Sequence, residues 1–265
     1  MQSNSLLLVG HGTRDPDGIA EMRGLLGRMR AALPEHQVEV GLLEFPTVGL
    51  PSLGDAVTRC VETGVLSLAV LPLLLHQAGH SKRDVPGQLL AALAQRPEVR
   101  LSTTPSLGIQ SRLLDVIIER ADQAERLFRG ADPTPTALLL VGRGSTDAEA
   151  NAEFFEVARL LKPRTAYGWV EGCFVSLAEP YVRDGIERCL DLGAQRVIVV
   201  PYFLSTGVLV KRIGSQVIDA QTAHPQNEFA VGSHIGIHPN LIEVLVEQAQ
   251  RLFANLAGTT EVILT

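Results

Sequence analysis

The stretch Leu6-Leu-Leu-Val-Gly-His11-Gly-Thr-Arg-Asp15 decides how this chain is organised, because it occurs twice. It returns as Leu138-Leu-Leu-Val-Gly-Arg143-Gly-Ser-Thr-Asp147, at an offset of 132 residues. A second stretch, Val70 to His80, returns as Val199 to Leu209 at an offset of 129. A duplicated chain builds two similar units. We therefore predict two tandem domains, at 1–132 and 133–265, with a cleft between them.

Composition limits the classes of protein to consider. With 46% hydrophobic and 20% charged residues, the chain is typical of a soluble globular protein. No apolar run reaches the ~18 residues that span a bilayer, and the N-terminus lacks a signal-peptide layout. Three cysteines without a CxxC pair indicate a reducing compartment, so we expect a cytoplasmic protein without a membrane partner. The net charge of −6 argues against a nucleic-acid partner.

Each half alternates short Val/Leu/Ile runs with amphipathic stretches, the pattern of a mainly parallel sheet flanked by helices, an α/β fold. In the first half, strands are expected at 5–9, 38–43, 66–74 and 99–103, and helices at 19–33, 50–63, from 82 onwards and 111–128. The polar, proline-bearing segment 129–135 marks the boundary, and the same order follows from 137. Ligands of such sheets bind at the carboxyl ends of the strands. The histidine-bearing loops leave that rim.

Two histidines are the main candidates for chemistry. His11 lies between two glycines directly after an apolar strand, and the flanking glycines leave its imidazole open to a ligand. A tight turn with a solvated histidine is the alternative. His80 leaves the third strand through Gln77-Ala-Gly79, so its loop can neighbour that of His11. Two imidazoles suit cobalt, iron or nickel, and an imidazole also accepts protons near neutral pH.

Two further side chains are expected at the same rim. Glu44 ends the second strand and brings a carboxylate there; a surface glutamate is the alternative. His76 lies four residues before His80 and is either a third metal ligand or a supporting residue. Cys60 and Cys189 occupy equivalent positions in apolar helical patterns, where a small core side chain is expected.

Several familiar catalytic patterns are missing from the sequence. There is no CxxC, HExxH, glycine-rich phosphate loop or nucleophile elbow. Val9-Gly-His11-Gly-Thr13 is similar to the Arg-His-Gly core of histidine phosphatases, but Gly10 stands where those enzymes carry their phosphate-binding arginine. Phosphoryl transfer is therefore disfavoured.

Together these residues resemble the sirohydrochlorin chelatase family (class II chelatase type) in its long, internally duplicated form. The matching pieces are Gly10-His-Gly-Thr-Arg-Asp15, Leu43-Glu44 before Pro51, Pro72 to His80 with Asp84-Val-Pro86, and Pro201 to Gly207 with Lys211-Arg-Ile213. They cover nearly the whole chain in the right order. The resemblance places the family's two active-site histidines on His11 and His80 and its nearby acidic residue on Glu44. Position 76 is commonly apolar or aromatic in the family, so His76 is a departure.

The resemblance implies a lyase that inserts a divalent metal into sirohydrochlorin, with release of two protons, in cobalamin or siroheme biosynthesis. We favour Co²⁺ narrowly over Fe²⁺, and expect no cofactor beyond the substrate metal ion. The alternative is a non-catalytic protein that traffics cobalt or nickel on its histidines. The duplication already supplies two units, so a monomer suffices, and a homodimer remains an alternative.

An octacarboxylate substrate requires basic residues in an acidic chain. Arg14, Lys82 and Arg83 flank the histidine loops, while Arg143, Lys211 and Arg212 take corresponding places in the second half. We predict that they bind substrate carboxylates through charge-assisted hydrogen bonds, together with Ser205 and Thr206. For most of them, ordinary solvated charge is the alternative. Arg143 replaces the histidine and Leu209 replaces His80, so one site per chain is expected, in the first repeat.

Overall fold

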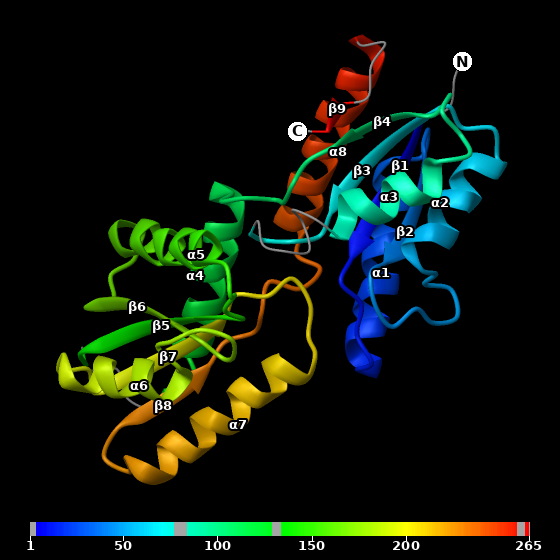
Figure 1. Ribbon diagram of the computed structural model, residues 1–265. Coiled ribbons are helices and arrows are strands. Elements are labelled where there is room, and N and C mark those ends of the chain that lie inside the picture. Colours follow the sequence, from blue (N-terminus) through cyan, green and yellow to red (C-terminus); the bar gives the residue numbers. More distant parts are fainter. Residues whose placement is uncertain (1–3, 77–83, 129–133, 259–262, 265) are drawn as a thin grey trace. The chain divides into compact units, whose positions relative to one another are not determined.

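The computed structural model describes residues 4–76, 84–128, 134–258 and 263–264 (Figure 1). It divides into two compact units. Unit 1 comprises residues 1–108 and 239–265, and unit 2 comprises residues 109–238. His80, Lys82 and Arg83 lie outside the described residues. The cleft expected between the repeats stays a prediction.

Unit 1 is built on a parallel sheet with the order β2-β1-β3-β4-β9. Its strands are β1 (Asn4–Gly10), β2 (Gln37–Leu42), β3 (Ser67–Pro72), β4 (Arg100–Thr103) and β9 (Ile263–Leu264). Val9 lies opposite Gly41 of β2 and Pro72 of β3, so these three strands end at one rim. Every residue of β3 is buried, as expected for a strand covered on both faces.

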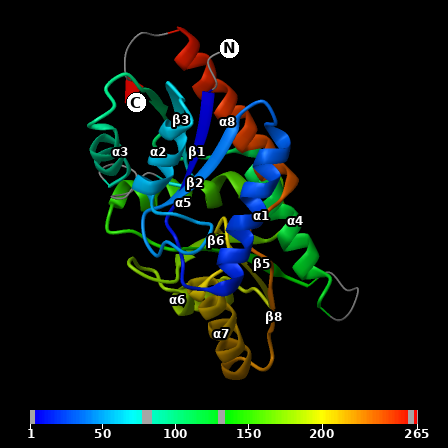
Figure 2. The same ribbon diagram turned by 90° about the vertical axis from the view of Figure 1, so that its right-hand side faces the viewer.

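Helices cover both faces of this sheet (Figure 2). On one face lie α1 (Pro16–Ala32) and α8 (Pro239–Gly258), and on the other α2 (Leu53–Glu62) and α3 (Val85–Leu93). Asp15 starts α1 as its N-cap and accepts hydrogen bonds from the backbone N–H groups of Asp17 and Gly18. The loop that carries His11 is therefore fixed at both ends, by β1 before it and by the cap after it.

Unit 2 repeats this plan with the sheet order β6-β5-β7-β8, again parallel. Its strands are β5 (Thr136–Gly142), β6 (Trp169–Phe174), β7 (Arg196–Pro201) and β8 (Glu228–Val231). Its helices are α4 (Ser111–Glu125), α5 (Ala148–Leu161), the short 3₁₀ helix η2 (Lys162–Arg164), α6 (Val182–Asp191) and α7 (Val208–Ala223). Helices α4 and α5 cover one face and α6 and α7 the other. The expected α/β fold of two similar sheets is confirmed.

The last helix of each sequence repeat packs on the sheet of the opposite repeat: α4, from the first repeat, belongs to unit 2, and α8, from the second repeat, belongs to unit 1. Figure 1 shows α8 along β3 and β4, and α4 beside α5. The connections are held at equivalent places. Arg120 of α4 donates to the carbonyls of His234 and Ile235 (both 3.2 Å), and Gln248 of α8 donates to that of Leu107 (3.1 Å). The compact units thus differ from the repeats at 1–132 and 133–265, because each fourth strand leads the chain on to the other sheet.

Two smaller expectations concern cysteines and membranes. Cys60 in α2 and Cys189 in α6 are fully buried among apolar side chains, which confirms their core role. Among the described residues, no helix has the length and apolar character needed to cross a membrane.

Candidate functional site

His11 lies immediately after β1, at the carboxyl rim of the unit 1 sheet. The residue is half-buried, and its Nδ1 atom is shielded from solvent. The next residue, Gly12, has φ +95°, and a Cβ there would lie 1.9 Å from the carbonyl oxygen of Glu44. Only glycine accommodates both this backbone conformation and this close approach. Gly12 therefore shapes the turn after His11, while Gly10 ends β1; that the glycines leave the imidazole open to a ligand stays a prediction.

The backbone brings Glu44 beside His11. After β2 ends, Leu43 N–H donates to the carbonyl of Gly10 (3.0 Å) and Glu44 N–H donates to that of His11 (2.9 Å). The strand pairing of β1 and β2 therefore continues into both loops. Glu44 is exposed, so its carboxylate is accessible at the same rim as the imidazole of His11. This adjacency depends on strand order, which the sequence pattern predicted only as a shared rim.

His76 follows β3, the neighbour of β1 on the other side. The pairing again continues past the strand, because Leu73 N–H donates to the carbonyl of Val9 (2.8 Å). His76 is half-buried, and both of its ring nitrogens are shielded from solvent. His76 and His11 thus leave adjacent strands at one rim. Within residues 4–76, 84–128, 134–258 and 263–264, no three His, Cys, Asp or Glu side chains form a metal-binding group. The expected ligand set includes His80, which lies outside these ranges.

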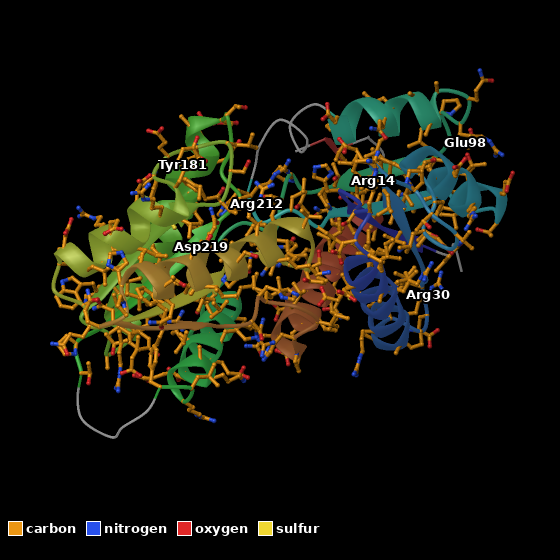
Figure 3. The ribbon with its side chains drawn as sticks, turned by 90° about the horizontal axis from the view of Figure 1, so that it is seen from below. Arg14, Arg30, Glu98, Tyr181, Arg212 and Asp219 are labelled. Carbon is orange, nitrogen blue, oxygen red and sulfur yellow. The ribbon has the colours of Figure 1, made fainter. Side chains whose placement is uncertain are left out.

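Arg14 is held by an aromatic ring. Its guanidinium carbon lies 4.3 Å from the centroid of the Phe45 ring, within the range of a cation–π contact. Arg14 is exposed beside the start of α1 (Figure 3), and Phe45 directly follows Glu44. A cation therefore lies on the loops that carry His11 and Glu44.

The sequence reasoning missed the role of Phe45, although a signal was present. The repeat offset falls from 132 at Glu44/Ser176 to 129 at Pro51/Pro180, so unit 1 carries three extra residues in the loop after β2. This loop, residues 45–50, is well braced. The backbones of Thr47 and Leu50 exchange two hydrogen bonds of 2.9 Å, and Arg23 of α1 donates to the carbonyl of Val48 (2.7 Å).

Unit 2 has the same backbone at its rim but different side chains. Val175 N–H donates to the carbonyl of Gly142 (2.9 Å), and Ser176 N–H donates to that of Arg143 (3.1 Å). Gly144 has φ +84°, and a Cβ there would lie 2.0 Å from the Ser176 carbonyl oxygen. Arg143 is exposed. Thus Arg143 replaces His11, and Ser176 replaces Glu44.

The other predicted residues of unit 2 lie around the start of α7. Ser205 and Thr206 precede the helix and are half-buried, while Lys211 and Arg212 are exposed on it (Figure 3 labels Arg212). Leu209, which replaces His80, packs against the apolar core of unit 2. The histidine position of the first repeat has therefore become a packing position in the second.

Comparison with known proteins gives consistent matches. The CbiX family model matches the chain twice, at residues 5–124 and 137–252. The sirohydrochlorin cobaltochelatase of Priestia megaterium is 35% identical over 93% of this chain and 79% of its own length. The sirohydrochlorin ferrochelatase of the same organism is 27% identical, over 98% of this chain and 94% of its own.

Solved structures agree with these matches. SirB from Bacillus subtilis with Fe³⁺ superimposes with a TM-score of 0.83 at 26% identity, covering 98% of this chain and all of the other. A cobalt complex of the sirohydrochlorin chelatase SirB from Bacillus subtilis subspecies spizizenii gives a TM-score of 0.80 at 25% identity. That match covers 97% of this chain and 98% of the other.

Proposed function

This chain belongs to the CbiX family, and we propose that it inserts a divalent metal ion into sirohydrochlorin at the rim of unit 1. The observation that carries the site assignment is the hydrogen bond from Glu44 N–H to the His11 carbonyl. It places a carboxylate and an imidazole on adjacent backbone segments at the carboxyl ends of parallel strands. The second repeat keeps this backbone arrangement and lacks both side chains.

Metal insertion requires two operations, and the residues at this rim fit both. Two pyrrole N–H protons must leave the macrocycle, and a metal ion must reach its face. A neutral imidazole is a suitable proton acceptor near pH 7 and also a ligand for divalent cobalt or iron. We assign these operations to His11 together with His80. Glu44 either receives a proton from a histidine or holds water on the incoming metal.

His76 is the third imidazole of this proposal. Both its ring nitrogens are shielded from solvent, and the residue follows β3 in the part of the chain that leads to His80. We propose that it either adds a ligand during delivery of the metal or fixes the position of that loop. A comparison of His76→Ala and His76→Phe separates these roles, because only the ligand role is lost in Phe.

Substrate binding is assigned to basic and hydroxyl side chains from both repeats. Sirohydrochlorin carries eight carboxylates, and cationic side chains bind carboxylates through charge-assisted hydrogen bonds, which are stronger than those between neutral groups. Arg14 in unit 1 and Arg143, Ser205, Thr206 and Lys211 in unit 2 are the described candidates, with Lys82 and Arg83 beside His80. Arg143 is exposed at the place of the lost histidine, which supports a binding role.

Cobalt is our proposed metal substrate, with iron second. The cobaltochelatase of P. megaterium has the higher identity of the two relatives compared, 35% against 27%. Imidazole and carboxylate ligands accept both ions, so the ligand types do not decide between them. Initial insertion rates with Co²⁺ and Fe²⁺, both under anaerobic conditions, measure the preference directly.

The function is tested by incubating the protein with sirohydrochlorin and Co²⁺ and following the absorbance of the macrocycle. We expect insertion well above the spontaneous rate, and a return to that rate in the His11→Ala variant. Tight Co²⁺ binding without accelerated insertion would instead support a trafficking protein. Turnover of a phosphatase substrate that depends on His11 would contradict both interpretations.

A further inference from the structure

The contact between Arg14 and Phe45 belongs to the histidine-bearing repeat alone. In the second repeat, Thr146 takes the place of Arg14, and Leu177 takes the place of Phe45. Both members of the pair are therefore missing where His11 and Glu44 are also missing. The pair lies on the same two loops as those residues, joined by the hydrogen bond between Glu44 and His11.

The fold does not require an aromatic residue at position 45. Phe45 has φ +51° and Leu177 has φ +62°, so both repeats bend into the left-handed region at this point. The bend follows the close approach of the preceding carbonyl to Gly12 or Gly144. Leucine occupies the same bend in unit 2, so the backbone accepts a residue without an aromatic face. Phe45 is 37% exposed, and burial does not account for it either.

The ring of Phe45 holds the guanidinium of Arg14 in place. Within the described part of the chain, no oxygen atom accepts a hydrogen bond from Arg14. Other arginines of unit 1 are differently engaged, because Arg30 pairs with Glu39 and Arg23 donates to the Val48 carbonyl. A guanidinium stacked on a ring keeps its N–H edge available, and that edge matches a carboxylate with two parallel hydrogen bonds.

The loop that carries Phe45 is braced, so the ring is positioned before any ligand binds. Leu50 anchors the far end of the loop with 1% of its surface exposed, and Arg23 fixes the Val48 carbonyl at its tip. A preformed binding group spares the loss of side-chain freedom that otherwise weakens binding. The extra residues of unit 1 thus contribute to a fixed support for Arg14.

We propose that Phe45 is a positioning residue that presents Arg14 to one peripheral carboxylate of the tetrapyrrole. This inference rests on the proposed function for the identity of the ligand. Arg14 makes the contact, and Phe45 acts through Arg14. Because unit 2 lacks the pair, this carboxylate contact is made by unit 1 only. It therefore helps to fix the orientation of the macrocycle relative to His11.

The test compares Phe45→Leu with Arg14→Gln and the double variant. Phe45→Leu copies the residue that the second repeat carries at the same bend, so the backbone is expected to be retained. We expect the KM for sirohydrochlorin to rise about fivefold in Phe45→Leu and about tenfold or more in Arg14→Gln, with kcat within twofold of wild type. The double variant should have the same KM as Arg14→Gln, and the Phe45→Tyr variant should retain the wild-type KM.

Two controls separate this role from others. Leu177→Phe makes the reverse change in the second repeat, where Thr146 offers no cation, and should leave KM unchanged. Thermal melting checks that each variant is folded. If Phe45→Leu raised KM by the same factor in the wild-type and in the Arg14→Gln protein, the proposal would be overturned, since Phe45 would then contact the macrocycle by itself. An unchanged KM in Phe45→Leu would overturn it as well.

Titration of sirohydrochlorin without metal keeps this proposal distinct from the proposed function. If wild-type protein binds the macrocycle but inserts no metal, the chelatase function fails. The same variants should then still weaken the measured Kd by about fivefold and about tenfold or more. If the variants bind as tightly as wild type, the Arg14–Phe45 proposal fails, whatever the insertion rate.

Discussion

Units 1 and 2 share the backbone of their rims and differ in the side chains attached to it. Gly12 and Gly144 adopt the same left-handed conformation against the same carbonyl, and the residues after Glu44 and Ser176 bend in the same way. At the position after the first strand, one unit carries histidine and the other arginine. The rim geometry is therefore a property of the repeat, whereas the chemistry depends on a few side chains placed upon it. Substitutions at equivalent positions of the two units therefore separate effects on the rim geometry from effects on the chemistry.

The largest expected difference is between His11→Ala and Arg143→Ala. Loss of a group that transfers protons or delivers the metal should lower kcat by about 100-fold or more. Loss of Arg143 should instead raise the KM for sirohydrochlorin by about tenfold, because a charge-assisted hydrogen bond is lost, and leave kcat nearly unchanged. Steady-state kinetics with Co²⁺ measure both. If His11→Ala retained full kcat, or if Arg143→Ala lost it, the division of roles would be wrong.

Gly12→Ala and Gly144→Ala should destabilise the protein alike. In each case the new Cβ would collide with a carbonyl oxygen, at 1.9 Å or 2.0 Å, and φ is +95° or +84°. We expect a loss of roughly 2–4 kcal/mol in the free energy of unfolding, measured by urea denaturation. Only Gly12→Ala should also lower kcat, because it displaces Glu44 relative to His11. Equal kcat values in the two folded variants would contradict that placement.

A smaller effect concerns the buried thiols at equivalent positions of α2 and α6. Burial, with a lesser contribution from Glu39, raises the pKa of Cys60 from 9.0 to about 11. Burial, with a lesser contribution from Glu171, raises the pKa of Cys189 to about 12. The folded state favours the neutral thiols, so their stabilisation is present below pH ~9 and is lost as pH rises towards 11–12.

Since one pKa unit corresponds to about 1.4 kcal/mol, the loss should reach roughly 2–3 kcal/mol per thiol by pH 11. Denaturation of wild type, Cys60→Ala and Cys189→Ala between pH 8 and 11 measures it. Each alanine variant should show a shallower fall of stability with pH than wild type. Parallel curves for all three proteins would show that the thiols ionise at the same pH in the folded and the unfolded chain, and the explanation would fail.

The last change should produce no gain of insertion activity. Ser205→His places an imidazole at the position equivalent to His76, but Arg143, Ser176 and Leu209 remain. Neither wild type nor the His11→Ala variant should gain insertion activity from it, as measured by the absorbance of the macrocycle. Any rescue would show that a single imidazole is sufficient at the second rim.

Local sequence predicted the elements and the rim but misplaced some ends. The apolar runs predicted the strands because buried parallel strands need them on both faces. Helix α2 begins at Leu53 rather than at residue 50, because Ser52 caps it and Leu50 belongs to the braced loop of unit 1. Helix α1 begins at Pro16 because Asp15 is its N-cap, whereas the apolar spacing first indicates a helix at Ile19.

Relations between distant segments could not be read from local patterns. The apolar spacing of α4 shows that one face is buried, but not that it packs on the second sheet. Likewise, the stacking of Arg14 on Phe45 depends on the adjacency of β1 and β2 and on the positive φ of Phe45. The change in repeat offset marked the extra residues, although it carried no information on what they support.

The exchange of last helices also bears on the order in which the protein folds during synthesis. Unit 2 is one continuous segment, 109–238, and every element it needs is synthesised before α8. Unit 1 is interrupted, because one face of β3 and β4 stays uncovered until residues 239–258 arrive. Domains usually fold in the order of translation. Here the earlier half must wait for α8, so the histidine-bearing unit is completed after unit 2.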